Sequence, residues 1–303
     1  MIMLRAHPCG PPPGRLCESP VWDSRTEEVL WVDIRGGHVH RARLTLGDSG
    51  PDLAHRSTIR LDPPVSAVVP CASGGLLVTA GATFYRIEAD GTVDRVAALS
   101  LPDDGIRRRL NDAKADPRGR LLAGTMSEDG VEGSAALYRL DPDGTLGILR
   151  DGVTISNGLG WSPDGAILYY ADSPTQRIDA FEYDLATGTF GGRRPFARFD
   201  DGDPDGLTVD ADGRVWVAVW GTGQVRAFDP SGRQCAVIDV GPSQVSSCAF
   251  AGPDLDVLVI TTAAEGPAVL EPDAGRLFVC TPGVTGLPAT PYADVGLVRS
   301  DVR

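Results

Sequence analysis

The sequence is poor in positive charge: it has one lysine, Lys114, among 303 residues, and its formal net charge at pH 7 is −13. Nucleic acids and anionic membranes attract basic surfaces, so this composition argues against either as a partner. We interpret most of the acidic excess as a well-solvated surface.

Several signals of other protein classes are also missing. The six cysteines form no Cys-x-x-Cys pair, which argues against a zinc–thiolate site. The chain has no Gly-x-Ser-x-Gly motif and no glycine-rich phosphate loop, so a Ser-His-Asp hydrolase is disfavoured. Residues 1–8 lack a sustained apolar core and no apolar run approaches about 18 residues. We therefore expect a cytoplasmic protein with reduced thiols and no membrane span.

What the sequence does contain is a recurring turn, at intervals of about 40 to 50 residues, the length of one blade of a β-propeller. Clear copies occur at 116–119, 162–165 and 210–213, each ending in glycine, and weaker copies lie near 23–26, 71–74 and 252–255. Short apolar segments flank them, with no long stretch of helical period. Six copies predict an all-β, six-bladed β-propeller, forming a single domain over residues 1–303 with residues 1–16 as an N-terminal arm.

A polar residue stands eight positions before each turn position, at the start of an apolar strand. These residues are Glu18, Ser66, Asn111, Asn157, Asp205 and Ser247. The first strand of each propeller blade lines the central axis, so equivalent positions should converge there. Strand-start polar residues often only cap turns. Six in register, two of them carboxylates, favour a ligand site on the axis.

Two further features flank this expected site. Arg109 and Asn111 are two residues apart in an extended segment, so they should share a face, with Asp112 facing the other way. A cation and an amide would then lie beside the axis. The polar loop at 127–134, which contains Glu128 and Asp129, suits either a lid or an ordinary hairpin loop.

Together these motifs resemble the regucalcin (senescence marker protein)/gluconolactonase family of six-bladed propellers, from about residue 16 to residue 264. Two departures are Ser19, where glycine is common, and Ala113 within an Asn-Asp-Gly-Lys-like stretch. The segments that carry the resemblance are Glu18-Ser19-Pro20-Val21-Trp22, Leu30-Trp31-Val32-Asp33-Ile34, Arg109-Leu110-Asn111-Asp112, Gly124-Thr125-Met126, Ser156-Asn157-Gly158-Leu159, Pro204-Asp205-Gly206-Leu207 and Thr261-Thr262-Ala263.

The resemblance implies one divalent metal ion, held by Glu18, Asn157 and Asp205. Two carboxylates and an amide oxygen form a hard, all-oxygen set, for which Ca²⁺ is our first choice and Zn²⁺, Mn²⁺ or Mg²⁺ are alternatives. The family's members hydrolyse sugar lactones, which here implies opening of a lactone to the aldonic acid.

We assign Asp205 as the general base of that reaction. The resemblance implies substrate contacts from Arg109 and Asn111, and we add Glu128 and Asp129 as substrate-binding candidates. The expected partner is a small-molecule sugar lactone, and the expected assembly is a monomer or weak homodimer.

Two other functions remain open at this point. A phosphotriesterase-like hydrolase would use a similar ion next to an apolar pocket. A non-catalytic calcium-binding scaffold would hold the ion for structural purposes and would have no use for an open polar wall of the kind that Arg109 and Asn111 would form.

Overall fold

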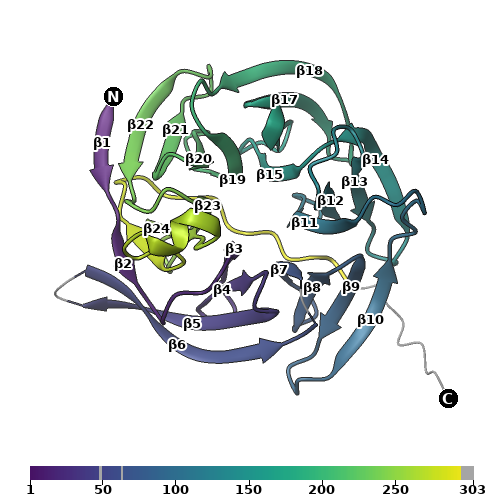
Figure 1. The fold of residues 1–303 in the computed structure, drawn as a ribbon, viewed down its shortest axis with the longest axis horizontal. Coiled ribbons are helices and arrows are strands. Elements are labelled where there is room, and N and C mark those ends of the chain that lie inside the picture. The colour runs from purple at the N-terminus through teal and green to yellow at the C-terminus, as the bar shows by residue number, and fades with distance from the viewer. Residues whose placement is uncertain (48–49, 63, 295–303) are drawn as a thin grey trace.

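The structure, a computed structural model, describes residues 1–47, 50–62 and 64–294. These residues form six β-sheets arranged as blades around a central axis (Figure 1). The all-β, six-bladed propeller predicted from the sequence is therefore confirmed. No helix within the described ranges is both long and apolar enough to cross a membrane.

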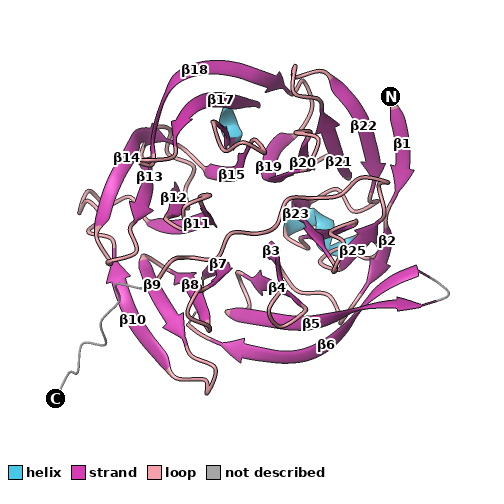
Figure 2. Cartoon of the chain, turned by 180° about the vertical axis from the view of Figure 1, so that it is seen from behind, coloured by secondary structure: helices cyan, strands magenta, loops and turns pink. Residues whose placement is uncertain are grey.

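The innermost strands of the six blades contact one another around the axis (Figure 2). Blades 1 and 2 consist of β3 (Cys17–Asp23), β4 (Glu28–Asp33), β5 (His38–Gly47), β6 (Gly50–Arg60), β7 (Val65–Pro70), β8 (Leu76–Ala80), β9 (Thr83–Ile87) and β10 (Val93–Ala98). Blades 3 and 4 consist of β11 (Arg108–Ala115), β12 (Leu121–Ser127), β13 (Ala135–Leu140), β14 (Leu146–Val153), β15 (Ser156–Trp161), β16 (Ile167–Asp172), β17 (Arg177–Asp184) and β18 (Thr189–Arg198).

The last two blades also use the N-terminal segment. Their own strands are β19 (Asp203–Val209), β20 (Val215–Trp220), β21 (Gln224–Phe228), β22 (Gln234–Asp239), β23 (Val245–Ala251), β24 (Val257–Thr262) and β25 (Leu277–Cys280). Within the expected N-terminal arm, β1 (Ile2–Arg5) pairs in parallel with β22 and β2 (His7–Cys9) pairs antiparallel with β25. The start of the chain thus adds an outer strand to blades 5 and 6 before β3 begins blade 1. Short 3-10 helices, η1 (Ser173–Thr175) and η2 (Gly266–Leu270), lie in two connecting loops. In chain order, the innermost strands of the six blades are β3, β7, β11, β15, β19 and β23.

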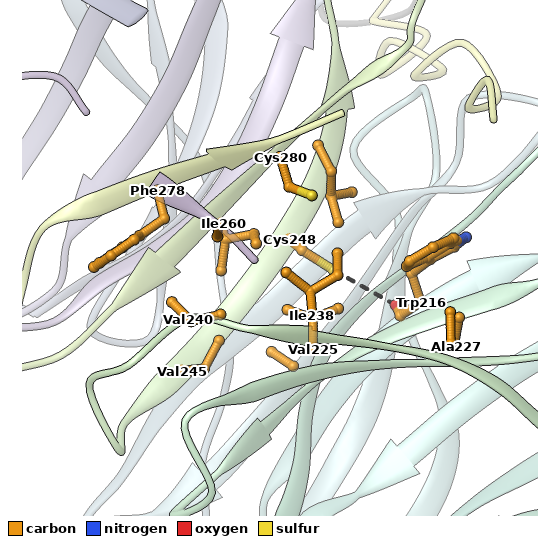
Figure 3. Packing of buried hydrophobic residues seen from close by; sticks show 14 of the residues in the cluster. Trp216, Val225, Ala227, Ile238, Val240, Val245, Cys248, Ile260, Phe278 and Cys280 are labelled. Atoms are coloured by element: carbon orange, nitrogen blue, oxygen red, sulfur yellow. Dashed lines mark hydrogen bonds between the residues drawn. The ribbon is translucent and has the colours of Figure 1, made fainter. Parts of the chain in front are cut away.

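Apolar side chains fill the gaps between neighbouring blades in six buried clusters. Figure 3 shows the cluster between blades 5 and 6, where Trp216 and Ile238 belong to the same cluster as Ile260 and Phe278. A further cluster joins blade 6 to blade 1, so the ring closes through apolar packing as well as strand pairing. Burying one large apolar side chain contributes about 1.5–3 kcal/mol, so these interfaces hold the blades in register around the axis.

The turns predicted after the inner strands are present. Gly119, Gly165 and Gly213 have φ values of 80°, 72° and 82°, a region that glycine adopts without steric penalty. Each glycine N–H donates to the carbonyl three residues earlier, at 2.7–2.9 Å. After each of these turns, the second strand of the blade runs antiparallel to the inner strand.

Every inner strand is bulged near its start. The strand register shifts at Glu18/Val21, Val65/Ala67, Leu110/Ala113, Asn157/Leu159, Pro204/Leu207 and Val245/Ser247. A bulge leaves residues unpaired and redirects their side chains. The six bulges coincide with the six polar positions picked out by the repeat, or lie within one residue of them, so the fold redirects side chains at the same point in every blade.

The segment after β25 crosses the ring at the turn end of the channel, the end where the inner strands finish (Figure 1). Gly286 pairs with Asp210 of blade 5, and Tyr292 pairs with Cys71 of blade 2. Tyr292 is fully buried, and its hydroxyl donates to the Asp141 carbonyl of blade 3 at 2.6 Å. This closing segment, residues 285–294, therefore ties together blades on opposite sides of the axis.

Candidate active site

Two carboxylates meet at the strand-start end of the channel, where the inner strands begin. Glu18 of β3 and Asp205 of β19 are both buried, with relative exposures of 8% and 7%. The backbone N–H of Ser19 donates to Oε2 of Glu18 at 2.8 Å. Oδ1 of Asp205 is buried and has no hydrogen-bond partner among the described residues. This oxygen can therefore accept a hydrogen bond or bind a cation.

The pKa shifts of the two carboxyl groups also indicate a site for a cation. Burial raises the pKa of Glu18 well above its ordinary value, and the nearby charges of Asp205 and Asp112 raise it further. Burial and Asp112 likewise raise the pKa of Asp205, whereas the Gly206 N–H and the Asn157 amide act in the opposite direction. Like charges in a buried site repel, so ionisation of the pair needs a compensating cation.

Asn157 and Asn111 connect the carboxylates to the rest of the wall. The Asn157 amide nitrogen donates to the Ser173 hydroxyl at 3.0 Å, which orients its carbonyl oxygen away from that contact. Asn111 donates to the backbone carbonyl of Ser156 at 2.9 Å and lies 3.4 Å from Oδ1 of Asn157. The structure thus brings together four of the six polar positions, Glu18, Asn111, Asn157 and Asp205, in one buried region.

The other two positions make different contacts. The Ser66 hydroxyl is 2.8 Å from the Thr79 hydroxyl on the next strand of its own blade. Ser247 lies against Gly206, where an added Cβ would stand 2.0 Å from the Ser247 hydroxyl oxygen. Only glycine permits this close approach between β19 and β23, immediately after Asp205.

Arg109 and Asn111 do share a face, as their spacing predicted. Nη1 of Arg109 donates to Oδ1 of Asn111 at 2.8 Å and to the Leu110 carbonyl at 2.9 Å. Burial lowers the pKa of Arg109 to about 10, and the neighbouring Arg35 acts in the same direction. The guanidinium nevertheless stays charged at neutral pH, and its buried Nε has no partner among the described residues.

Glu128 and Asp129 lie farther out, at the rim. Both pair with Arg107, at 3.0 Å and 2.9 Å, and the Arg107 side chain is 69% exposed. Glu128 also acts electrostatically on Arg109. The two acidic residues are therefore close to the wall formed by Arg109, with Arg107 as their direct partner.

The expectation for Asp112 is wrong. Strict alternation would turn Asp112 away from Asn111, but both lie within the bulge of β11, and both are buried. Asp112 lines a cavity between the inner strands and therefore faces the axis, and its charge raises the pKa of Glu18 and of Asp205. A bulge cancels the two-residue period on which the prediction rested.

Sequence reasoning also missed Lys114. A cavity of about 350 Å³ lies on the axis toward the turn end, and both Asp112 and Lys114 line it. Its other walls are largely apolar, with Trp161, Phe250 and Leu287 of the closing segment among them. The one sequence signal was the isolation of this lysine in an acidic chain.

The donor set fits a hard divalent cation. Glu18 and Asp205 offer carboxylate oxygens, Asn157 offers an amide oxygen, and Oδ1 of Asp205 is buried with no hydrogen-bond partner from the described residues. Oxygen ligands of this kind suit Ca²⁺, Mg²⁺ or Mn²⁺. Across residues 1–47, 50–62 and 64–294, no three His, Cys, Asp or Glu side chains come together in a metal-binding arrangement. The candidate set contains only two such residues, its third member being an amide.

Comparison with known proteins identifies the family. Residues 16–264 match the model of the SMP-30/Gluconolactonase/LRE-like region. The chain belongs to this family. It is 35% identical over 288 residues to regucalcin of Bos taurus, covering 91% of this chain and 94% of that protein.

Solved structures agree with this assignment. A calcium-binding protein, regucalcin, from Agrobacterium tumefaciens superposes with a TM-score of 0.85 at 26% identity, covering 96% of this chain and 99% of its own. A gluconolactonase from Xanthomonas campestris gives a TM-score of 0.68 at 25% identity, with 90% and 96% covered. Membership of the SMP-30/gluconolactonase family supports a lactonase-like function.

The structure explains how Ser19 occupies a position where glycine is common in the family. Ser19 has φ of 51°, in the left-handed region that glycine adopts most readily. Its hydroxyl oxygen accepts from the Val68 N–H at 3.3 Å, which ties blade 1 to blade 2. Glycine adopts this conformation without steric penalty, so a glycine at this position, as is common in the family, would take the same backbone conformation as Ser19 does here.

Proposed function

We propose that this protein is a metal-dependent hydrolase that opens a sugar lactone to the corresponding aldonic acid. The observation that carries the proposal is the buried pair of Glu18 and Asp205, in which Oδ1 of Asp205 has no partner in the part of the chain that the structure describes. Two carboxylates held together out of solvent destabilise one another unless a cation joins them. A fold selected for stability alone would gain from losing one of them.

Glu18, Asn157 and Asp205 would hold one divalent ion, with Ca²⁺ as first choice and Zn²⁺, Mn²⁺ or Mg²⁺ as alternatives. When bound, the ion would polarise the lactone carbonyl and stabilise the negative charge that develops on its oxygen. Asp205 has two carboxylate oxygens, so one can contribute to holding the ion while the other accepts a proton from the attacking water.

The reaction adds water across the acyl C–O bond of the ring. The water oxygen bonds to the carbonyl carbon, the bond to the ring oxygen breaks, and the ring oxygen leaves with a proton as a hydroxyl group. The resulting acid ionises at neutral pH, so turnover releases one proton. Asp205, which takes the first proton, can return it to the leaving oxygen.

Arg109 and Asn111 form the wall that we assign to the substrate. The guanidinium donates to the amide oxygen of Asn111, whose amide nitrogen donates to the Ser156 carbonyl, so both groups are held in a fixed orientation. A charged donor and an amide suit sugar hydroxyls and a carbonyl oxygen. We assign Glu128 and Asp129 a role in binding at the rim, where hydroxyl groups farther from the reacting carbon would lie.

The test is a panel of sugar lactones assayed by proton release, on EDTA-treated protein and after adding back each metal. We expect turnover of at least one lactone that disappears with EDTA and returns with the preferred ion. Asp205→Ala should abolish this turnover, whereas Ser66→Ala, at the equivalent position of another blade, should retain it. Turnover that is indifferent to EDTA would refute the metal-dependent reaction.

A second candidate is a calcium-binding protein without catalysis, because the regucalcin from Agrobacterium tumefaciens is described as calcium-binding. Ca²⁺ binding without turnover of any lactone in the panel would favour it. A phosphotriesterase-like activity is less well supported, because the wall beside the carboxylates is polar, with Arg109 and Asn111 buried in it. A phosphotriester included in the panel tests it directly.

A further inference from the structure

The only lysine of the chain spans the central channel. Lys114 belongs to β11 of blade 3, yet its Nζ donates to the backbone carbonyl of Leu207, on β19 of blade 5, at 2.7 Å. Leu207 lies two residues after Asp205 on the same strand. The ammonium group is therefore tethered across the axis, next to the strand that carries one of the candidate metal ligands.

Lys114 and Asp112 act on each other. Their side chains line the same axial cavity. Burial raises the pKa of Asp112 and Lys114 opposes that shift, while burial lowers the pKa of Lys114 and Asp112 opposes it in turn. A lysine in such surroundings loses much of its hydration, so its retention on the axis calls for a function.

The charges on the axis can be counted. Glu18, Asp112 and Asp205 are three buried carboxylates on the axis, and Lys114 is the ammonium group that acts on one of them, Asp112. When all are ionised, the group carries two negative charges. A divalent cation neutralises this group, whereas without the lysine three negative charges would remain.

The other charges near the site do not alter this count. Arg109 acts weakly on Glu18, but it lies among Arg35, Glu128 and Glu265 at the strand-start end, and these two cations and two carboxylates balance one another. Arg35 and Glu265 form a direct ion pair at 2.8 Å. Asp203, the next carboxylate on β19, is only partly buried, so solvent screens it more strongly.

We propose that Lys114 is the internal cation that matches the axial site to a divalent ion. This inference rests on the proposed metal site. Lys114 touches neither the metal nor the substrate: it acts through Asp112, whose charge it neutralises, and it is a positioning residue in the electrostatic sense. Removing its charge should shift the preference of the site toward a trivalent ion.

Coulomb's law gives the expected change in the relative affinity of the site for divalent and trivalent ions. Nζ of Lys114 contacts the Leu207 carbonyl, two residues beyond Asp205 on β19, which at about 3.3 Å per residue is roughly 7 Å along the strand, so we take the two charges to be on the order of 10 Å apart. Two unit charges about 10 Å apart, at an effective dielectric constant of about 20, change an affinity by roughly tenfold. Raising the charge of the bound ion by one unit should therefore change the ratio of affinities by roughly that factor.

The experiment measures the dissociation constants of Ca²⁺ and Tb³⁺ by calorimetric titration of the full chain. Four proteins are compared: wild type, Lys114→Met, Asp112→Asn and the double variant. We expect the preference for Tb³⁺ over Ca²⁺ to rise roughly tenfold in Lys114→Met, to fall in Asp112→Asn and to return toward wild type in the double variant. Loss of the bond to Leu207 alone would loosen the channel without producing these opposite shifts.

The outcomes separate the two proposals. A wild-type chain that binds neither ion overturns the metal site, and this inference with it. A wild-type chain that binds Ca²⁺, with an ion preference that neither variant alters, overturns the role of Lys114 and leaves the metal site intact. If Lys114→Met does not fold, Asp112→Asn still decides the question, because an unchanged preference in that isosteric variant refutes the charge-matching argument.

Discussion

Replacing Asp205 with asparagine should stabilise the metal-free protein and weaken its metal binding. Asp205 is buried, Oδ1 lacks a partner among the described residues, and the charge of Asp112 disfavours its ionisation. Asparagine has nearly the same shape and no charge, so the variant removes the repulsion. It also removes one of the two negative charges available to a cation. Stability and metal affinity should therefore change in opposite directions.

The magnitude depends on pH in a defined way. The folded-state pKa of Asp205 is raised above the ordinary value of 3.8, so the metal-free wild type loses stability as pH rises from about 4 through the folded pKa. Asparagine does not titrate. A buried, unsatisfied polar group costs about 1–3 kcal/mol, so we expect a gain of that order at pH 8 and none near pH 4. For a chain of 303 residues the gain corresponds to a rise in Tm of roughly 2–5 °C.

The assay is thermal unfolding in EDTA at pH 8 and near pH 4, with metal affinity measured by titration on the same preparations. We expect affinity to fall by at least about a hundredfold, because one of two charges that face the cation is gone. The matched control is Asp210→Asn, in the turn after the same strand. Asp210 accepts from the N–H groups of Asp212 and Arg214 and from the Trp216 indole, at 2.8–3.0 Å. That variant should lower Tm. An Asp205→Asn protein that is destabilised in EDTA like the control would refute the reasoning.

Four other variants test separate parts of the structure. Ser66→Ala should keep metal affinity and kcat/KM close to wild type, because its hydroxyl bonds Thr79; a large loss of affinity would place Ser66 in the site after all. Arg109→Ala should lower kcat/KM roughly ten- to a hundredfold with little change in metal affinity. The control variant, Arg108→Ala, removes hydrogen bonds to a loop and should lower Tm without changing kcat/KM. Wild-type kinetics in Arg109→Ala would show that Arg109 has a structural role. Tyr292→Ala should destabilise the fold by roughly 3–5 kcal/mol without altering the kinetics of folded protein, since Tyr292 is fully buried in the closing segment; chemical unfolding measures this, and an unchanged midpoint would contradict it.

The fold could be predicted, and a candidate site proposed, because the propeller repeats. A turn glycine such as Gly165 marks the same point in each blade, so a fixed offset from the turns reaches the same depth on the axis. That offset picks out the candidate ligands Glu18, Asn157 and Asp205 among its six positions, without any knowledge of their contacts. It depends only on the symmetry of the architecture, which is why it survived the variation in sequence between blades.

What could not be predicted depends on local departures from that symmetry. Asp112 faces the axis because β11 is bulged, and an alternating strand pattern has no means of showing a bulge. Lys114 reaches Leu207 across two blade positions, a contact that exists only once the ring has closed. The repeat also treated Ser66 and Asp205 as equivalent, although the first bonds within its own blade. Equivalent backbone positions fix where the Cα atom of a residue lies, but they do not determine which group its side chain contacts.

The residue that follows each axial position carries information that the repeat left unused. Gly158 and Gly206 come directly after Asn157 and Asp205, and neither has a positive φ. A Cβ on Gly158 would lie 2.4 Å from the Asp205 carbonyl oxygen, and one on Gly206 would meet the Ser247 side chain. These glycines are needed because neighbouring inner strands approach too closely for a side chain. The same close approach brings the polar groups of successive blades within reach of one another, so a polar residue followed by glycine at a strand start indicates where the axis is narrow enough to form a site.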